Sequence, residues 1–354
     1  MNNKAIIAMS GGVDSSVAAY LLTSRGYDCI GATMKLYDND DIMLSREKTC
    51  CSLDDIEDAR SVARKLGMPY YVFNFKDEFK QKVIDKFIST YENGGTPNPC
   101  IDCNRYLKFE KLFQRMKELE FDYVVTGHYA VVEKKDGWYY LKKGKDESKD
   151  QSYVLYSLSQ EQLSHILFPL GEYSKSEIRE IAESQGFVNA RKKDSQDICF
   201  VPDGNYAGFI EKYTGKTYPD GDFVDVNGNI IGRHKGIIRY TNGQRKGLGV
   251  AFGKPMYVSG KDISKNTVTL STNEELYSDT LTAIDFNWII PSPAKTIKCC
   301  ARVRYNMKEQ SATAYINEDN SVKIVFEKPQ RAITKGQAVV LYDGDTVLGG
   351  GTIL

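Results

Sequence analysis

Three cysteines in two distant motifs are the residues of this sequence best suited to carry chemistry. Cys100 and Cys103 lie in the segment Thr-Pro-Asn-Pro-Cys-Ile-Asp-Cys at residues 96–103. Cys199 lies far downstream, in Asp-Ser-Gln-Asp-Ile-Cys-Phe at residues 194–200. In a cytoplasmic chain, cysteines are typically reduced thiols, metal ligands or redox groups rather than a disulfide framework. Sulfur chemistry is therefore the first hypothesis.

A second motif, Ser-Gly-Gly-Val-Asp-Ser-Ser at residues 10–16, follows an apolar run and precedes a helix-like run. Gly11 and Gly12 let phosphate approach the backbone, whose consecutive N–H groups can bind an anion. Ser15 and Ser16 fall at the expected helix start, where hydroxyls cap free amides. Asp14 would repel bare phosphate, so we expect it to hold Mg²⁺ between phosphate oxygens. The motif predicts a site for magnesium and a triphosphate.

This loop differs from the two most familiar phosphate-binding loops. It has neither the Gly-Lys-Ser/Thr of a Walker A loop nor the Gly-x-Gly-x-x-Gly of dinucleotide-binding folds. The simpler alternative is an ordinary strand-to-helix turn with a serine cap. Together with the distant thiols, however, the loop suggests an enzyme that activates a substrate with ATP and then delivers sulfur to it.

Composition sets limits on the partners. The chain has 354 residues, enough for two or three domains, and a formal net charge of zero, so a polyanion would need locally basic surface. Such a stretch exists, because no acidic residue occurs between Asp225 and Asp262 while seven lysines and arginines do. We expect phosphate-backbone contact there, although a solvated loop is the alternative. The apolar runs are too short for a secretory segment or a membrane span, which predicts a cytoplasmic protein with no membrane partner.

Strand and helix signals alternate in the first half of the chain. Apolar runs at 5–9, 29–34, 70–75 and 123–126 are separated by helical patterns, one at 52–66 and a later one opened by Ser174 and Glu177. This predicts a doubly wound parallel α/β domain over 1–205, whose part 151–205 is helical. Asn227-Gly228, Asn242-Gly243 and Asp343-Gly344 predict hairpins. We expect a small central β domain over 206–275 and a C-terminal β-barrel over 276–354.

The loop resembles the signature of the PP-loop ATP pyrophosphatases. The ordered motif set, from Ala5 to the C-terminus, resembles that of the tRNA-specific 2-thiouridylases. Besides the loop, the matching segments are 96–99, 126–130 (Thr-Gly-His-Tyr-Ala), 149–153 (Lys-Asp-Gln-Ser-Tyr), 194–200, 243–249 (Gly-Gln-Arg-Lys-Gly-Leu-Gly) and 349–351 (Gly-Gly-Gly).

The resemblance implies roles for individual residues. ATP would be bound by Ala8, Met9, Ser10, Gly11, Gly12, Val13, Asp14, Ser15, Met34 and Gly127. Cys103 would be the catalytic nucleophile, and Cys199 would carry the incoming sulfur as a persulfide. Contact with tRNA would involve Asn98, Pro99, Cys100, His128, Lys149, Asp150, Gln151, Arg304, Tyr305 and Gln337.

The implied reaction is the conversion of the wobble uridine of tRNA to 2-thiouridine, with release of AMP and pyrophosphate. The expected tRNAs read Lys, Glu and Gln codons, and the sulfur donor would be a cysteine desulfurase or a relay protein. The base must leave its stack to react. Arg191, Lys192 and Lys193 are expected to lower the pKa of the Cys199 thiol.

One position departs from the family pattern, because Cys100 stands where typical members have an Asp proposed as an acid/base partner. A thiol titrates near 8.5 rather than about 3.9, so it cannot simply replace that carboxylate, and the adjacent Asp102 is the alternative candidate for the acid/base role. Alternatively, Cys100, Cys103 and Cys199 hold an iron–sulfur cluster that activates sulfide. Ligation of this kind suits a Cys-x-x-Cys pair and a third thiol better than acid/base work does. The inert alternative is a spare thiol beside a persulfide site.

Other interpretations remain open. Cys50 and Cys51 could complete a zinc site with Cys100 and Cys103, although adjacent ligands fit the usual spacing poorly. PP-loop synthetases that transfer nitrogen would share the loop but would not need the thiols. A tRNA-binding protein with a relic loop would not need an intact Asp14.

Overall fold

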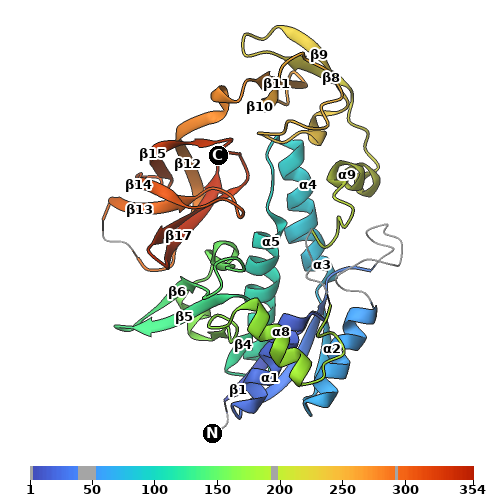
Figure 1. The fold of residues 1–354 in the computed structure, drawn as a ribbon, viewed down its shortest axis with the longest axis vertical. Coiled ribbons are helices and arrows are strands. Elements are labelled where there is room, and N and C mark those ends of the chain that lie inside the picture. The colour runs from blue at the N-terminus through green and yellow to red at the C-terminus, as the bar shows by residue number, and fades with distance from the viewer. Residues whose placement is uncertain (1–2, 39–52, 193–197, 292–293) are drawn as a thin grey trace.

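The computed structural model describes residues 3–38, 53–192, 198–291 and 294–354 (Figure 1). Its N-terminal part is built on a five-stranded sheet of order β3-β2-β1-β4-β7, in which every pair is parallel. The strands are β1 (Lys4–Ala8), β2 (Asp28–Lys35), β3 (Tyr70–Asn74), β4 (Tyr123–Val125) and β7 (Ile166–Leu167). The four predicted strands all lie in this sheet, so the doubly wound α/β class is confirmed.

Helices cover both faces of the sheet because side chains alternate along each strand. Ile7 packs in one apolar cluster with α1 (Val13–Ser24), α2 (Leu53–Lys65) and α8 (Lys175–Ser184). Ile6 packs in a second cluster on the other face. That face is covered by a chain of short helical segments: α3 (Lys76–Phe79), η1 (Lys80–Ile84), α4 (Asp85–Glu92), α5 (Pro99–Asp102), η2 (Cys103–Lys111) and α6 (Leu112–Glu118).

The helix predicted from Ser174 and Glu177 is confirmed as α8. Ser174 Oγ accepts a hydrogen bond from Glu177 N at 3.3 Å, and Ser174 N donates to Glu177 Oε2 at 2.6 Å, which completes a capping box. The predicted cap of α2, Ser52, lies outside the described residues. Between β4 and α8 lie η3 (Ser152–Leu155) and α7 (Gln160–Ser164).

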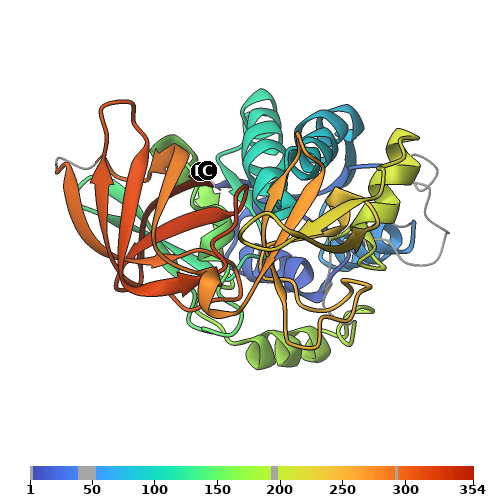
Figure 2. The same cartoon turned by 90° about the horizontal axis from the view of Figure 1, so that it is seen from above.

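Two β modules follow the α/β domain and occupy opposite sides of the molecule in Figure 2. After α9 (Tyr206–Thr214), a four-stranded sheet has the order β10-β11-β8-β9. Its elements are β8 (Gly221–Val224), β9 (Ile230–His234), η4 (Ile237–Arg239), β10 (Tyr257–Asp262) and β11 (Thr267–Ser271). After η5 (Glu274–Leu276), six strands form the C-terminal barrel, which closes because β12 pairs with both β15 and β17. They are β12 (Tyr277–Trp288), β13 (Thr296–Arg302), β14 (Gln310–Ile316), β15 (Val322–Arg331), β16 (Ala338–Asp343) and β17 (Thr346–Ile353).

Two of the three predicted hairpin turns are confirmed. Asn227-Gly228 joins β8 to β9, and Asp343-Gly344 joins β16 to β17. The prediction for Asn242-Gly243 is wrong, since this pair lies in the long connection between η4 and β10. Gly243 has φ of +85° there, and a Cβ on it would lie 2.8 Å from the Ala332 Cβ. The glycine therefore serves close packing against the barrel rather than a two-residue hairpin.

A hairpin from the N-terminal part extends the sheet of the C-terminal barrel. Its strands are β5 (Ala130–Lys135) and β6 (Trp138–Lys143), and β6 pairs with β17 through Lys142 and Thr346. The segment directly after Gly127 therefore links the α/β domain to the barrel. Among the described residues, no helix combines the length and the apolar character needed to cross a membrane.

Candidate functional site

The glycine-rich loop connects β1 to α1 at the carboxyl edge of the parallel sheet. Gly11 has φ of +74°, and a Cβ on it would lie 2.3 Å from the carbonyl oxygen of Asp55, so only glycine fits. Ser15 Oγ donates to Gly12 O at 3.0 Å and accepts from Ser10 N at 3.2 Å. These hydrogen bonds within the loop fix its shape.

The expected serine caps do not form at α1. Gly12 is the N-cap residue and makes no side-chain cap hydrogen bond. Instead, Ser16 Oγ donates back to Gly12 O at 3.0 Å and accepts from Asn189 Nδ2 at 2.9 Å. The first N–H groups of α1 have no intrahelical partners, so the loop can present them to phosphate.

The other two predicted ATP positions lie beside this loop. Met9 N donates to Ala32 O at 2.9 Å, and Thr33 Oγ1 donates to Met9 O at 2.6 Å, which places Met34 next to the end of β1. A Cβ on Gly127, just after β4, would lie 2.9 Å from Asp14 C and from Ser15 N. Three strand ends therefore converge where α/β sheets bind their ligands.

We expect Gly127→Ala to slow the ATP-dependent step, because its new methyl group must displace the backbone between Asp14 and Ser15. Misplacement of a bound substrate by about 1 Å can cost roughly 100-fold in rate. The measurement is tRNA-dependent pyrophosphate release, with Gly232→Ala in β9 as the control. A Cβ on Gly232 would make only ordinary contacts, the nearest at 3.5 Å to Val250. Equal pyrophosphate release by Gly127→Ala and the unmodified chain would contradict this account.

Asp14 is held by two neighbours rather than facing solvent alone. Lys175 Nζ lies 2.8 Å from each carboxylate oxygen, and Tyr129 Oη donates to Asp14 Oδ1 at 2.7 Å. Lys175 belongs to α8 and Tyr129 directly precedes β5. The sequence motif did not reveal this ion pair.

Cys100 and Cys103 lie on consecutive helical segments. Pro99 is the first residue of α5, and Cys103 begins η2, a nine-residue π-helical segment of the kind often found at functional sites. Cys100 is exposed, whereas Cys103 is partly buried. Burial raises the pKa of the Cys103 thiol to about 11, and the nearby Lys108 opposes that change. In this state Cys103 is a neutral thiol at physiological pH.

Asp102 does not face solvent as a free acid or base. Its carboxylate is buried and accepts a 2.6 Å hydrogen bond from Lys86 Nζ. Burial raises the pKa of Asp102, whereas Lys86 lowers it. Asp102 thus forms an ion pair with Lys86. No described contact supports Asp102 in the acid/base role proposed for the Asp that typical family members have in place of Cys100.

Cys199 is fixed at the same edge of the sheet by its neighbours. Tyr37, three positions after Met34, donates from its hydroxyl to Cys199 O at 3.1 Å. The ring of Phe200 is almost fully buried, with centroids 5.7 Å from Phe79 and 5.2 Å from Phe87. The structure therefore places Cys199 and Phe200 beside the strand that carries Met34.

The cations next to this motif are engaged by carboxylates. Lys192 Nζ lies 2.6 Å from both Asp55 Oδ1 and Asp58 Oδ2, and Arg191 Nε lies 3.2 Å from Glu183 Oε1. Lys193, with residues 194–197 of the motif, lies outside the described residues. The contacts of Arg191 and Lys192 give no support to their expected role in activating Cys199.

Two of the residues expected to contact tRNA form hydrogen bonds between the barrel and the N-terminal part of the chain. Gln337 Nε2 donates to Thr96 O at 2.9 Å and to Pro97 O at 3.1 Å, directly before Asn98 and Pro99. Tyr305 Oη donates to Asp150 O at 3.2 Å. Burial raises the pKa of Tyr305, and nearby Asp150 raises it further.

The remaining members of this set are mostly engaged inside the fold. Arg304 Nη2 donates to the carbonyls of Asn242 and Ala332 at 3.0 and 2.9 Å. Gln151 Oε1 accepts from Tyr129 N at 3.0 Å. Lys149 is partly exposed beside them.

His128 is buried rather than presented to solvent. Its Nδ1 lies 2.6 Å from Thr126 Oγ1, and its ring packs against Phe109 and Phe168. Burial, reinforced by Lys108, keeps the pKa of His128 well below its usual range, so the ring is neutral. Contact of this side chain with tRNA stays a prediction.

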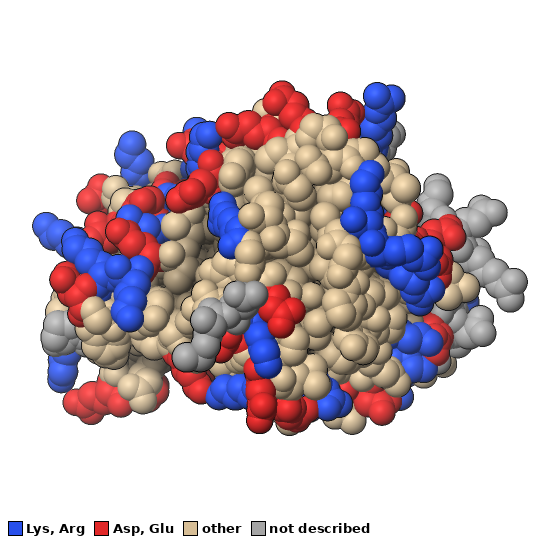
Figure 3. Space-filling view, turned by 90° about the horizontal axis from the view of Figure 1, so that it is seen from below, with Lys and Arg blue, Asp and Glu red and all other residues tan. Residues whose placement is uncertain are grey.

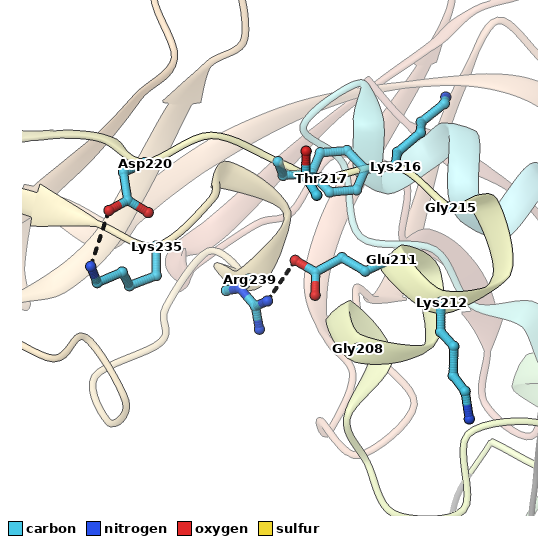
Figure 4. A pocket seen from close by; sticks show the side chains of 10 residues that line it. Gly208, Glu211, Lys212, Gly215, Lys216, Thr217, Asp220, Lys235 and Arg239 are labelled. Atoms are coloured by element: carbon cyan, nitrogen blue, oxygen red, sulfur yellow. Dashed lines mark hydrogen bonds and ion pairs between the residues drawn. The ribbon is translucent and has the colours of Figure 1, made fainter.

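Acidic neighbours offset much of the basic stretch between Asp225 and Asp262. Arg239 and Lys235 line a groove of about 690 Å³ beside α9 (Figure 4), where they pair with Glu211 at 2.5 Å and with Asp220 at 3.0 Å. Arg245, Lys246 and Lys254 remain exposed. On the face seen from below, positive and negative side chains also alternate around an uncharged centre (Figure 3).

Among the described residues, no three His, Cys, Asp or Glu side chains are grouped to hold a metal ion. Cys100, Cys103 and Cys199 are all described, so the structure does not gather them as cluster ligands. Cys50 and Cys51, the other half of the alternative zinc site, lie outside the described residues.

The parallel sheet, its phosphate-binding loop and the thiol motifs at its edge define an ATP-using enzyme of the PP-loop class. Three family models match the chain in order: "tRNA methyl transferase HUP domain" over 3–203, "tRNA methyl transferase PRC-barrel domain" over 207–272 and "Aminomethyltransferase beta-barrel domain" over 278–353.

The full-length relatives carry a name based on thiolation rather than methyl transfer. The tRNA-specific 2-thiouridylase MnmA of Clostridioides difficile is 52% identical, over 100% of this chain and 98% of that protein. Its namesakes in Clostridium acetobutylicum and Acetivibrio thermocellus are each 51% identical, over 100% and 99% of both chains, respectively. The chain belongs to the tRNA-specific 2-thiouridylase family.

Proposed function

We propose that this chain adenylates the C2 oxygen of the wobble uridine in tRNA and then replaces that oxygen with sulfur. As a family member it is an ATP-dependent tRNA sulfurtransferase. The observation that best supports the proposal is the convergence of the glycine-rich loop, Gly127 and the Cys199 motif at one edge of the sheet.

The loop would bind the triphosphate through the N–H groups that start α1, and Asp14 would provide the carboxylate for Mg²⁺. Asp14 suits this role because it lies in the first turn of α1, at the mouth of the loop, and is partly exposed. When bound, Mg²⁺ would offset negative charge on the phosphates. The uridine oxygen attacks the α-phosphorus, the bond to the β-phosphate oxygen breaks, and pyrophosphate leaves with that electron pair.

For the second half of the reaction we propose a persulfide on Cys199. The Cys103 thiolate attacks the inner sulfur of this persulfide, which forms a disulfide and releases hydrosulfide. Hydrosulfide adds to C2, AMP leaves, and 2-thiouridine remains. A thiol reductant then supplies two electrons to restore both cysteines. Direct attack by the terminal persulfide sulfur is the other form of this route.

The resting pKa of about 11 means that Cys103 must lose its proton during the reaction. Lys108 is the cation whose charge lowers this pKa. Bound tRNA would bring negative charge and exclude water, both of which disfavour a thiolate, so the positive charge of Lys108 is the described feature that favours loss of this proton.

We route no step through an iron–sulfur cluster, because among the described residues no three His, Cys, Asp or Glu side chains are grouped to hold a metal ion. The expected substrates are tRNAs that read Lys, Glu and Gln codons, and the expected sulfur donor is a cysteine desulfurase or a relay protein. Because the substrate is tRNA, we assign the reaction to the cytoplasm. The test of the function is mass spectrometry of nucleosides from tRNA incubated with the protein, ATP and a persulfide or sulfide source. Absence of 2-thiouridine at the wobble position would overturn the proposal.

We expect Cys100→Ala to keep most of its thiolation activity, because on the proposed persulfide route only Cys103 and Cys199 carry out the sulfur chemistry. The variant and the unmodified protein should be purified and reconstituted with iron and sulfide without oxygen. Thiolation by iron-free protein and by Cys100→Ala would support the persulfide route. Stoichiometric iron and sulfide, a visible absorption band lost in Cys100→Ala, and sulfide-dependent activity would together establish the cluster instead.

A further inference from the structure

Lys175 forms an ion pair with Asp14 at the mouth of the glycine-rich loop. Its ammonium nitrogen lies 2.8 Å from both oxygens of Asp14, and its side chain is only 11% exposed. The same nitrogen lies 5.9 Å from the centre of the Tyr129 ring, whose hydroxyl also binds Asp14. Lys175 thus lies at the place beside Asp14 where a cation is expected.

The backbone that carries Lys175 is firmly held. Lys175 is the first residue of α8, directly after the capping box of Ser174 and Glu177. Its own N–H donates to Asp146 Oδ2 at 3.0 Å. Ile178 and Ala182 of α8 are fully buried in the apolar cluster shared with α1. A change in ligand state would therefore move the flexible lysine stem rather than the helix.

We propose that Lys175 is a phosphate-binding residue that neutralises Asp14 until Mg·ATP arrives and then transfers to the pyrophosphate leaving group. The inference rests on the proposed role of Asp14. Mg²⁺ binds carboxylate oxygen directly, and an ammonium group on both oxygens of Asp14 competes with it and repels it. Once displaced from Asp14, the Lys175 ammonium group can reach the incoming triphosphate by rotation of its own side chain. The triphosphate then supplies the negative charge with which the ammonium group pairs.

This transfer would make Lys175 active in the step itself. As the bond between the uridine oxygen and the α-phosphorus forms, the bond to the bridging oxygen breaks and its electron pair stays on pyrophosphate. The uridine N3 proton passes to solvent, and Lys175 stays protonated. A lysine beside a departing phosphate stabilises charge that grows in the transition state, which raises the rate more than it raises ground-state affinity.

The test compares Lys175→Met with Lys145→Met, whose lysine is 56% exposed and pairs with Glu177 on the same helix. For Lys175→Met, we expect the kcat of tRNA-dependent pyrophosphate release to fall by about 100-fold or more, with a smaller change in the KM for ATP. Lys175→Arg should recover part of the loss. Mn²⁺ binding to the nucleotide-free protein, followed by electron paramagnetic resonance, should tighten roughly tenfold in Lys175→Met, because the competing ammonium is gone.

Unchanged or weaker Mn²⁺ binding by a folded Lys175→Met protein overturns the inference, because the ammonium on Asp14 would then not compete with the metal ion. Normal pyrophosphate release by this variant overturns it as well. If Lys175→Met does not fold, Lys175→Gln takes its place in both measurements. The Asp14→Asn variant distinguishes a failure of the role of Lys175 from a failure of the proposed role of Asp14. If it loses pyrophosphate release while Lys175→Met keeps it, only the role of Lys175 fails. If both keep it, the proposed role of Asp14 fails too.

Discussion

Asp14→Ala is expected to abolish thiolation by stopping adenylation. The change removes the carboxylate proposed to hold Mg²⁺ at the mouth of the loop, and with it the electrostatic positioning of the triphosphate. Loss of one group of this kind typically costs about 100- to 1,000-fold in rate. The measurement is tRNA-dependent pyrophosphate release, which reports adenylation before any sulfur is transferred.

The control for this prediction must account for the partner of Asp14. Removal of the carboxylate leaves Lys175, which is only 11% exposed, without its ion pair, so some loss of folding stability is expected. Thermal unfolding and tRNA affinity should therefore be measured alongside activity, and Asp54→Ala on the first turn of α2 serves as a matched exposed carboxylate. Undiminished pyrophosphate release by folded Asp14→Ala protein would show that the loop has no role in adenylation.

Periodic patterns made the elements of the fold predictable. The four apolar strands, the Ser174 capping box and the hairpin at Asp343-Gly344 follow from local alternation, capping and turn chemistry, and all are present. Asn242-Gly243 failed because tertiary packing against Ala332 decided its conformation. Nothing periodic predicted that the β5–β6 hairpin would join the sheet of the barrel.

Single polar contacts between distant segments were the part of the site that sequence could not supply. The start of α8 was predictable, but no local signal says that Lys175 reaches Asp14. The sequence likewise predicts that Lys192 acts on Cys199, whereas in the structure Lys192 pairs with Asp55 and Asp58. Such ion pairs depend on how helices far apart in the chain pack, which neither spacing nor composition encodes.

Cys199→Ser is expected to adenylate tRNA normally but to lose thiolation from a persulfide donor. The serine hydroxyl cannot carry sulfur, whereas the triphosphate site depends on the loop, Met34 and Gly127. Pyrophosphate release should therefore stay within about threefold of the unmodified chain, while 2-thiouridine falls to background. Cys300→Ser is the control, since this cysteine lies in β13 of the barrel.

Thiolation with inorganic sulfide distinguishes a Cys199 that carries sulfur from a Cys199 that ligates a cluster. If Cys199 only carries sulfur, excess hydrosulfide should attack the adenylated base directly and restore 2-thiouridine in Cys199→Ser, because C2 is already activated. A cluster ligated by Cys199 would be lost in the same variant, and sulfide would then restore nothing. Labelled sulfur from a persulfide donor should also be recovered on Cys199 of the unmodified protein after tryptic digestion without reductant. If no label is found there while thiolation proceeds, Cys199 is not the carrier.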